Sequence, residues 1–166
     1  MSPTYRIFPL DREGERSGFH CGVEAQDRYF HERVTQDIRR RITTCFVARD
    51  DKHRVAGFYT LAATSLLLAD LPEVTAKKLP RYPTVPAIRL GRLAVDQAVR
   101  GQGLGGALLA DALSRAIDSG IAAFALVVDA KDAEATAFYE HHGFNPLANQ
   151  PRTLFLPLAT ARSVRR

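Results

Sequence analysis

The feature that most constrains the fold is a glycine-rich loop between a strand-like run and a helical run. The strand-like run is Ile88–Val95, the loop at residues 100–106 reads RGQGLGG, and helical spacing follows to Ser119. Glycines let main-chain N–H groups converge on an anion without a Cβ in the way, and a helix N-terminus adds partial positive charge. Arg100 can reach the same anion. We therefore expect this loop to bind a ligand that contains a pyrophosphate.

Other interpretations of the loop fit less well. No Gly-Lys-Ser/Thr closes it, as a P-loop requires. Gly101, Gly103 and Gly106 match the G-x-G-x-x-G of a dinucleotide-binding unit, and Asp129 ends the next strand. In that unit, however, the first glycine follows the strand at once, and the ~37 residues after Asp129 are too few for the remaining strands. A tight turn without a ligand is the structural alternative.

The hydrophobic pattern predicts an α/β fold with a mixed sheet. Strands are expected at 5–8, 42–48, 55–63, 88–95, 122–128, around 144 and at 153–158, and helices at 25–38, 73–79, 103–119 and 133–142. The runs 42–48 and 55–63 flank a polar turn and predict a hairpin. The run 122–128 is apolar enough to be a central strand that is buried on both faces. Prolines between residues 70 and 86 exclude a long regular element there.

Length and composition indicate one globular domain over residues 1–166, with residues 162–166 as a frayed basic tail. The net charge of +5 permits a polyanionic partner without requiring one. Cys21 and Cys45 form no CxxC pair, which favours two buried thiols in a reducing compartment. The charged N-terminus is unlike a signal peptide, and the longest apolar run, Phe58–Ala69, is shorter than the ~20 residues that span a bilayer. We therefore expect a cytoplasmic protein without a membrane segment.

The loop and a second motif together resemble the GNAT acetyltransferase superfamily. RGQGLG matches its Q/R-x-x-G-x-G/A acyl-CoA loop, and residues 135–144, ATAFYEHHGF, are similar to its A-x-x-F/L-Y-x-x-x-G-F motif. The resemblance implies the GNAT fold, with a mixed, mostly antiparallel central sheet, flanking helices and a splayed strand pair that binds acetyl-CoA. The sequence departs from the pattern at Asp132, where many members have asparagine, and this puts a minor cofactor contact in doubt.

Residues 79–96 narrow the resemblance to the GNAT toxins of toxin–antitoxin operons. The segments that carry it are LPRYP (79–83), VPA (85–87) and LGRLAVD (90–96). Those enzymes acetylate the α-amino group of aminoacyl-tRNA and stop translation, and an antitoxin with a ribbon-helix-helix DNA-binding part is their partner. The resemblance therefore implies an aminoacyl-tRNA substrate, acetyl-CoA as co-substrate, no metal, such an antitoxin and a homodimer.

The resemblance also implies the site residues. The main chain of Leu93 and Val95 would bind the pantetheine, with the Val95 N–H donating to the developing oxyanion. The pyrophosphate would lie against Arg100, Gly101, Gly103, Leu104 and Gly105. Tyr139 would be the acid that protonates the leaving thiolate, because a phenol with a pKa near ~10 is protonated at neutral pH. An α-amino group titrates near ~8, so a strong base is optional. A core tyrosine is the structural alternative for Tyr139.

Other polar residues have simpler interpretations. His141 and His142 end a helix, where cationic side chains suit the helix dipole. His20, His31 and His53 have no metal-ligand spacing. The basic clusters 39–41 and 77–81 form either a solvated face or phosphate contacts of an RNA substrate. Two other functions stay open: an acetyltransferase for a small-molecule or protein amine, and a non-catalytic module that binds acyl-CoA or nucleic acid.

Overall fold

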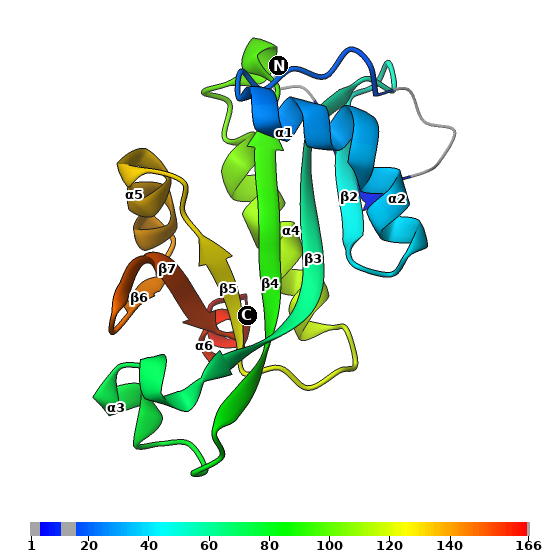
Figure 1. Cartoon of the computed structure of the whole chain (residues 1–166). Coiled ribbons are helices and arrows are strands. Elements are labelled where there is room, and N and C mark those ends of the chain that lie inside the picture. Colours follow the sequence, from blue (N-terminus) through cyan, green and yellow to red (C-terminus); the bar gives the residue numbers. More distant parts are fainter. Residues whose placement is uncertain (1–3, 11–15, 166) are drawn as a thin grey trace. The chain divides into compact units, whose positions relative to one another are not determined.

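A computed structural model describes residues 4–10 and 16–165 (Figure 1). The strands are β1 (Arg6–Pro9), β2 (Thr44–Arg49), β3 (Val55–Leu67), β4 (Thr84–Val95), β5 (Ala125–Asp129), β6 (Asn145–Leu147) and β7 (Gln150–Pro157). The α-helices are α1 (Glu24–Arg28), α2 (Val34–Arg39), α3 (Glu73–Ala76), α4 (Leu104–Ile117), α5 (Ala133–His141) and α6 (Leu158–Arg165). A π-helical turn, η1 (Tyr29–Arg33), joins α1 to α2, and η2 (Leu68–Asp70) and η3 (Gln97–Val99) are 3₁₀ turns.

The seven strands follow the order β1-β2-β3-β4-β5-β7-β6, so the sheet is mixed, as predicted. The chain forms two compact units. The first contains the described residues up to Ala62 together with Gly91–Ala112, and the second contains Ala63–Leu90 together with the described residues from Leu113. The long strands β3 and β4 each contribute to both units. The single domain expected from the chain length stays a prediction.

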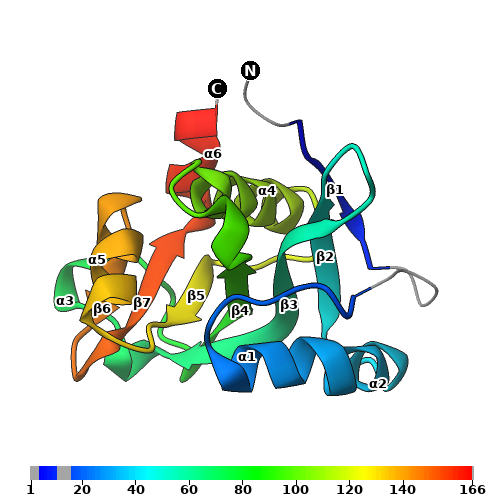
Figure 2. The ribbon, with the colours of Figure 1, turned by 90° about the horizontal axis from the view of Figure 1, so that it is seen from above.

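In the first unit, an antiparallel sheet is covered on both faces. β2 and β3 form the predicted hairpin, with Val47 opposite Phe58 and Phe46 opposite Tyr59. Figure 2 shows α1 and α2 on one face of these strands and α4 on the other. The α4 side approaches closely, because a Cβ on Gly57 would lie 2.8 Å from a methyl carbon of Leu108. A glycine in this strand therefore lets the helix contact the sheet directly.

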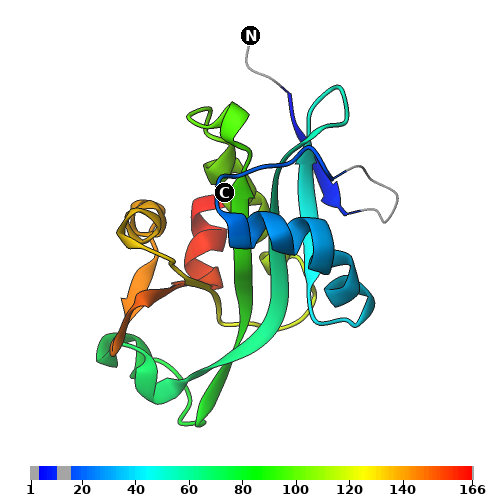
Figure 3. The same ribbon diagram turned by 45° about the horizontal axis from the view of Figure 1, so that its top comes forward.

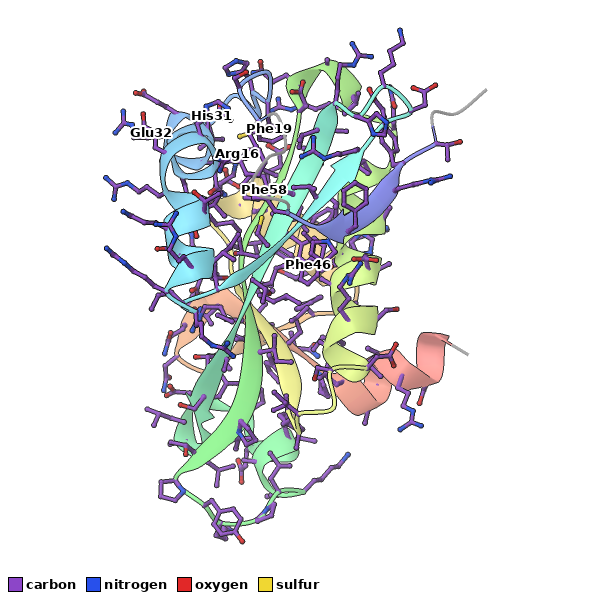
Figure 4. The ribbon with its side chains drawn as sticks, turned by 90° about the vertical axis from the view of Figure 1, so that its right-hand side faces the viewer. Arg16, Phe19, His31, Glu32, Phe46 and Phe58 are labelled. Atoms are coloured by element: carbon purple, nitrogen blue, oxygen red, sulfur yellow. The ribbon has the colours of Figure 1, made fainter. Side chains whose placement is uncertain are left out.

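Aromatic rings fill the space between the sheet and α1–α2. Phe58 stacks on Phe30 at 4.3 Å between ring centroids and meets the edge of Phe19 at 5.5 Å (Figure 4). All three rings are almost fully buried. Arg16 donates a 2.8 Å hydrogen bond to the main-chain oxygen of Phe30. Burying each phenyl ring contributes roughly 1.5–3 kcal/mol, so this cluster is a major source of stability in the unit.

The helical region 24–39 occurs where the periodicity predicts it, but it is not one regular helix. The π-helical turn at Tyr29–Arg33 interrupts the α-helical hydrogen bonding. Tyr29, Phe30 and Val34 are buried at this point. Periodicity alone cannot predict such a turn, because one extra residue per turn shifts the register while the apolar face stays continuous.

In the second unit, β5 is the central strand, as its apolar sequence predicted. It pairs in parallel with β4, from Ala87–Ala125 to Leu90–Val128, and antiparallel with β7. Residues 125–128 are completely buried. Figure 3 shows α5 beside the hairpin of β6 and β7.

Three elements differ from the sequence predictions. β3 extends to Leu67 and β4 begins at Thr84, because the strands keep their alternation of buried and exposed residues past the predicted ends. Residues 158–165 form α6, so the predicted frayed tail is helical up to Arg165, and Arg166 lies outside the described residues. Among the helices of the described chain, none has the length and apolar character needed to cross a membrane.

Candidate active site

The last part of β4 continues beyond its registered pairing with β5. The pairs end at Leu90 and Val128, whereas β4 continues to Val95. Ala94 is buried in the aromatic cluster of the first unit, and Leu93 and Val95 are half-buried. Because successive side chains of a strand alternate, Leu93 and Val95 face away from that cluster. Side-chain packing on one face of β4 therefore holds in place the main-chain groups of Leu93 and Val95.

The glycine loop has the backbone geometry that its sequence predicts. Gly101 and Gly103 have φ angles of 79° and 80°, the left-handed region that favours glycine. A Cβ added to either residue would meet no atom within 4 Å. Backbone conformation, and not crowding by the protein, therefore explains both glycines, and the space beside them is open.

Helix α4 starts immediately after these glycines. Its first hydrogen bond runs from the Ala107 N–H to the Gly103 oxygen at 3.1 Å. The N–H groups of Leu104 and Gly105 precede this bond and have no acceptor inside the helix. The first turn contains no acidic residue, and Leu104 is buried, which anchors the turn. The helix therefore presents main-chain donors and partial positive charge to an anion.

The segment immediately before α1, at His20 and Cys21, forms hydrogen bonds with residues 96–100, which lead into the glycine loop. Asp96 accepts hydrogen bonds from the main-chain N–H of Ala98 (2.9 Å) and of His20 (3.0 Å), and the Gln97 N–H donates to the His20 oxygen (2.9 Å). The guanidinium of Arg100 donates to the main-chain oxygen of Cys21. A guanidinium has five N–H donors, so this bond orients Arg100 and leaves donors for an anion. The contact of His20 and Cys21 with the loop was not predicted from the sequence.

Gly22 is the sequence signal that could have revealed it. Its φ angle is 91°. A Cβ there would lie 2.2 Å from Nε2 of the Gln97 side chain and 3.2 Å from the guanidinium of Arg100. The left-handed backbone favours glycine here, and its missing side chain leaves room for Gln97 and Arg100.

Arg92 holds β4 against the helical region of the first unit. Its guanidinium lies over the Tyr29 ring at 3.8 Å and donates a 2.6 Å hydrogen bond to Gln26. Its main-chain N–H donates to the hydroxyl of the buried Thr60 at 3.0 Å. These contacts fix the strand immediately before Leu93.

Tyr139 lies near the end of α5, in the second unit. Asp132 caps the start of this helix by accepting a 2.8 Å hydrogen bond from the Ala135 N–H. At the other end, the Phe144 N–H donates to the Tyr139 oxygen (3.1 Å) and the Gly143 N–H donates to the Glu140 oxygen (3.0 Å). With Gly143 at φ 92° this is a Schellman motif, and Phe144 makes the accompanying ring contact with Tyr139 at 5.5 Å. The Y-x-x-x-G-F pattern therefore sets the position of Tyr139.

The Tyr139 side chain is buried and protonated. Only 8% of the residue is exposed, and burial raises the pKa of its phenol to about 12. Within the described part of the chain, no group forms a hydrogen bond with its hydroxyl. A neutral hydroxyl in an apolar setting is suited to donate a proton to an anion that enters its surroundings.

His142, which follows the last residue of α5, differs from the prediction. His142 packs on Phe138 at 4.8 Å between ring centroids, and burial, with the neighbouring His141, lowers its pKa. At pH 7 the His142 ring is therefore neutral and not the cation expected at a helix C-terminus. Across residues 4–10 and 16–165, no group of three or more His, Cys, Asp or Glu side chains could hold a metal ion.

The structure thus gathers most predicted site residues in the first unit. Leu93 and Val95 lie on one strand end, and Arg100, Gly101, Gly103, Leu104 and Gly105 follow it directly. Tyr139 belongs to the second unit.

Comparisons with known proteins identify the family. The model of the acetyltransferase (GNAT) domain matches residues 41–146. The probable toxin TacT of Sinorhizobium fredii (strain NBRC 101917 / NGR234) is 35% identical over 169 residues, which cover 95% of this chain and 93% of that protein. The tRNA-acetylating toxin of Mycobacterium tuberculosis (strain ATCC 25618 / H37Rv) is 37% identical over 150 residues, or 89% of each chain.

Solved structures agree with this result. A KacT variant with a tyrosine-to-phenylalanine substitution matches with a TM-score of 0.90 and 28% identity, over 96% of this chain and 98% of that one. AtaT complexed with acetyl-methionyl-tRNAfMet matches with a TM-score of 0.90 and 29% identity, over 98% and 100%. AtaTR bound with acetyl-CoA matches with a TM-score of 0.85 and 28% identity, over 98% of each chain. The GNAT fold predicted from the two motifs is confirmed, and the chain belongs to the GNAT acetyltransferase family.

Proposed function

We propose that this enzyme transfers an acetyl group from acetyl-CoA to the α-amino group of aminoacyl-tRNA, and that it blocks translation as the toxin of a toxin–antitoxin pair. The observation that carries the proposal is the 37% identity to a tRNA-acetylating toxin over 89% of both chains. The match to AtaT in complex with acetyl-methionyl-tRNAfMet supports the same substrate class.

The glycine loop fits the pyrophosphate of acetyl-CoA. Open space lies beside Gly101 and Gly103, and the first N–H groups of α4, at Leu104 and Gly105, have no helical acceptor. Arg100 adds a charge that is already oriented by Cys21. On β4, the main chain of Leu93 and Val95 is proposed to hydrogen-bond to the pantetheine amides.

Two groups of the chain are proposed to serve the chemistry. When bound, acetyl-CoA supplies a thioester whose carbonyl carbon accepts the amine. The Val95 N–H donates to the carbonyl oxygen as negative charge develops there, and such donors contribute roughly 10²–10³ in rate. Tyr139 donates its phenolic proton to the departing sulfur, and its raised pKa keeps that proton in place at neutral pH. The α-amino group titrates near ~8, so a useful fraction attacks as the free base.

The partners follow from the same class of toxin. We propose a cognate antitoxin with a ribbon-helix-helix DNA-binding part, a homodimer, and a cytoplasmic location. A toxin requires neutralisation by a partner until it is needed, and its charged-tRNA substrate is cytoplasmic. Cys21 and Cys45 are both buried and neither is part of a disulfide, which suits a reducing compartment.

The test uses purified protein, radiolabelled acetyl-CoA and a bulk pool of aminoacylated tRNA, with uncharged tRNA as the control. Label that enters only the charged pool, and leaves with the amino acid on mild base treatment, is the expected result. Sequencing the labelled tRNAs then identifies the preferred acceptor. Label found only in polyamine or peptide controls would replace the tRNA substrate with another amine. The absence of any transfer would favour a binding module.

A further inference from the structure

The segment between β3 and β4, residues 68–83, is called the excursion here. It carries an exposed tyrosine ring whose backbone is restrained by neighbouring prolines. Tyr82 is 69% exposed. Pro80 and Pro83 flank it and restrict its backbone, and the Leu68 N–H donates to the Pro83 oxygen at 3.0 Å. Leu71 and Val85 are buried in the apolar cluster of the second unit. Figures 1 and 3 show this segment, with α3, as an excursion from the strand ends.

The excursion contains Asp70 and Glu73 in its first part, and the stretch that follows, which holds Tyr82 and continues through β4, has cations as its only charged residues. No aspartate or glutamate occurs between residues 74 and 95, and five cations do: Lys77, Lys78, Arg81, Arg89 and Arg92.

Two of these cations lie within four residues of Tyr82 in the chain and have no acidic partner among the described residues. Lys77 pairs with Glu73 at 3.4 Å, and Arg89 pairs with Asp129. Lys78 and Arg81 are exposed, and neither forms an ion pair with any residue that the structure describes. Tyr82 is therefore preceded, within four residues, by two exposed cations that can bind phosphates.

This combination matches the chemistry of unpaired nucleic acid. Single-stranded nucleotides bind where a base stacks on an exposed ring and the flanking phosphates meet lysine or arginine. Leu67 at the end of β3 and Val74 in the excursion are 54% and 72% exposed and would also suit a protein partner. The absence of acidic residues from 74 to 95 favours a polyanion over a protein surface of mixed charge.

We propose that Tyr82, Lys78 and Arg81 form a stacking platform for an unpaired nucleotide of the tRNA substrate. The inference rests on the proposed function, because tRNA carries its amino acid on an unpaired 3′ end. The platform binds and positions the RNA and takes no part in acetyl transfer. A stacked base would add affinity whatever the base, and the two cations would add a salt-sensitive contribution.

The first experiment measures RNA binding without acetyl-CoA, by fluorescence anisotropy. One probe is an acceptor-stem hairpin with its unpaired 3′ tail, and the other is the same hairpin with a blunt end. Tyr82→Ala should weaken binding of the tailed hairpin by about 5- to 150-fold and leave the blunt hairpin unchanged. Tyr82→Phe keeps the ring and should bind as the wild type does. Ile121→Ala, at a side chain that is 77% exposed and outside the platform, is the matched control.

The second experiment varies the salt concentration. Lys78→Gln and Arg81→Gln should each weaken binding of the tailed hairpin and reduce the slope of log affinity against log salt by about 0.7. Melting temperatures of all variants should equal that of the wild type, because these side chains are exposed.

Three results would overturn the platform. Wild-type affinity of Tyr82→Ala for the tailed hairpin is one, and equal losses on both hairpins is another. A change in oligomeric state of Tyr82→Ala on light scattering, with RNA affinity unchanged, would assign the surface to a protein partner. Failure of the proposed function has a different signature, since the wild type would then place no label in charged tRNA, whatever its affinity for the two hairpins.

Discussion

The glycine loop and the end of α5 hold their proposed site residues in opposite ways. In the loop, Gly101 and Gly103 are exposed, and the proposed binding groups are main-chain N–H groups. At the end of α5, Tyr139 is almost completely buried and offers one hydroxyl. In the proposed mechanism, the loop binds its ligand in the space that the glycines leave open, whereas Tyr139 acts through its one hydroxyl group.

This difference predicts which substitutions should impair each region. A loop that binds through its backbone depends on φ angles, so adding a Cβ harms it. A buried side chain depends on its own chemistry and on the contacts that place it. Phe144 and Gly143 place Tyr139, and each uses a local hydrogen bond of the Schellman motif to do so.

Tyr139→Phe should have the largest effect. We expect kcat to fall roughly 10²–10⁴-fold, because the leaving sulfur loses its proton donor. Folding and acetyl-CoA affinity should be preserved, because no described residue depends on the hydroxyl. The measurements are steady-state kinetics, thermal melting and calorimetric titration with acetyl-CoA. A kcat close to that of the wild type would remove Tyr139 from the mechanism.

Gly103→Ala should weaken acetyl-CoA binding at least about tenfold, because the left-handed backbone is strained by a Cβ that also enters the open space beside the loop. The strain of ~1–2 kcal/mol should lower the melting temperature by about 2–8 °C. Gly120→Ala is the matched control, since Gly120 has a φ of 79° and open surroundings but lies outside the loop. Equal affinity losses in both variants would show that strain alone, and not the loop, is responsible.

The pH dependence sharpens the description of Tyr139. Its pKa of about 12 means that the acid stays protonated as the pH rises, so no descending limb is expected below pH 10. The ascending limb belongs to the amine, which titrates near ~8, and kcat/KM should rise about tenfold from pH 7 to 9. Initial rates across this range provide the check. A descending limb below pH 10 would mean that another group, or a less buried Tyr139, supplies the proton.

Asp132 should show the smallest effect. Asp132→Ala removes the helix cap and should cost ~1 kcal/mol of unfolding free energy, or about 2–4 °C in melting temperature. Asp132→Asn should be nearly neutral, because asparagine caps helices as well as aspartate does. Chemical denaturation of the two variants measures the difference. A large loss in the asparagine variant would point to a role for the carboxylate charge.

Much of the fold was predictable because the decisive interactions are local or strongly patterned. The hairpin of β2 and β3 follows from two apolar runs around the polar turn at Asp50, whose carboxylate accepts from the N–H groups of Lys52 and Arg54. β5 follows from its continuous apolar sequence. The start of β4 at Thr84 was not predictable, since prolines at 83 and 86 argue against a strand. Pairing overrides this preference, and the Pro86 oxygen accepts from the Phe124 N–H.

The candidate site likewise has features that the sequence predicts and features that it does not. The left-handed glycines of the loop and the helix end around Tyr139 are visible in short motifs. The fastening of the loop by His20, Cys21 and Gly22 is not, because these residues lie far from Asp96 and Arg100 in the chain. The packing of Arg92 on Tyr29 is equally invisible, since it needs the helical region to cover β4.

The sequence by itself therefore determined the elements, the two motifs and the family to which they belong. These depend on φ preferences, periodicity and capping, which act over a few neighbouring residues. Only the tertiary structure decided which distant segment anchors the loop, where the π-helical turn lies, and that the Tyr139 phenol is buried and protonated. Those outcomes depend on which surfaces meet when the chain closes, and burial then sets the pKa and the free space that the chemistry uses.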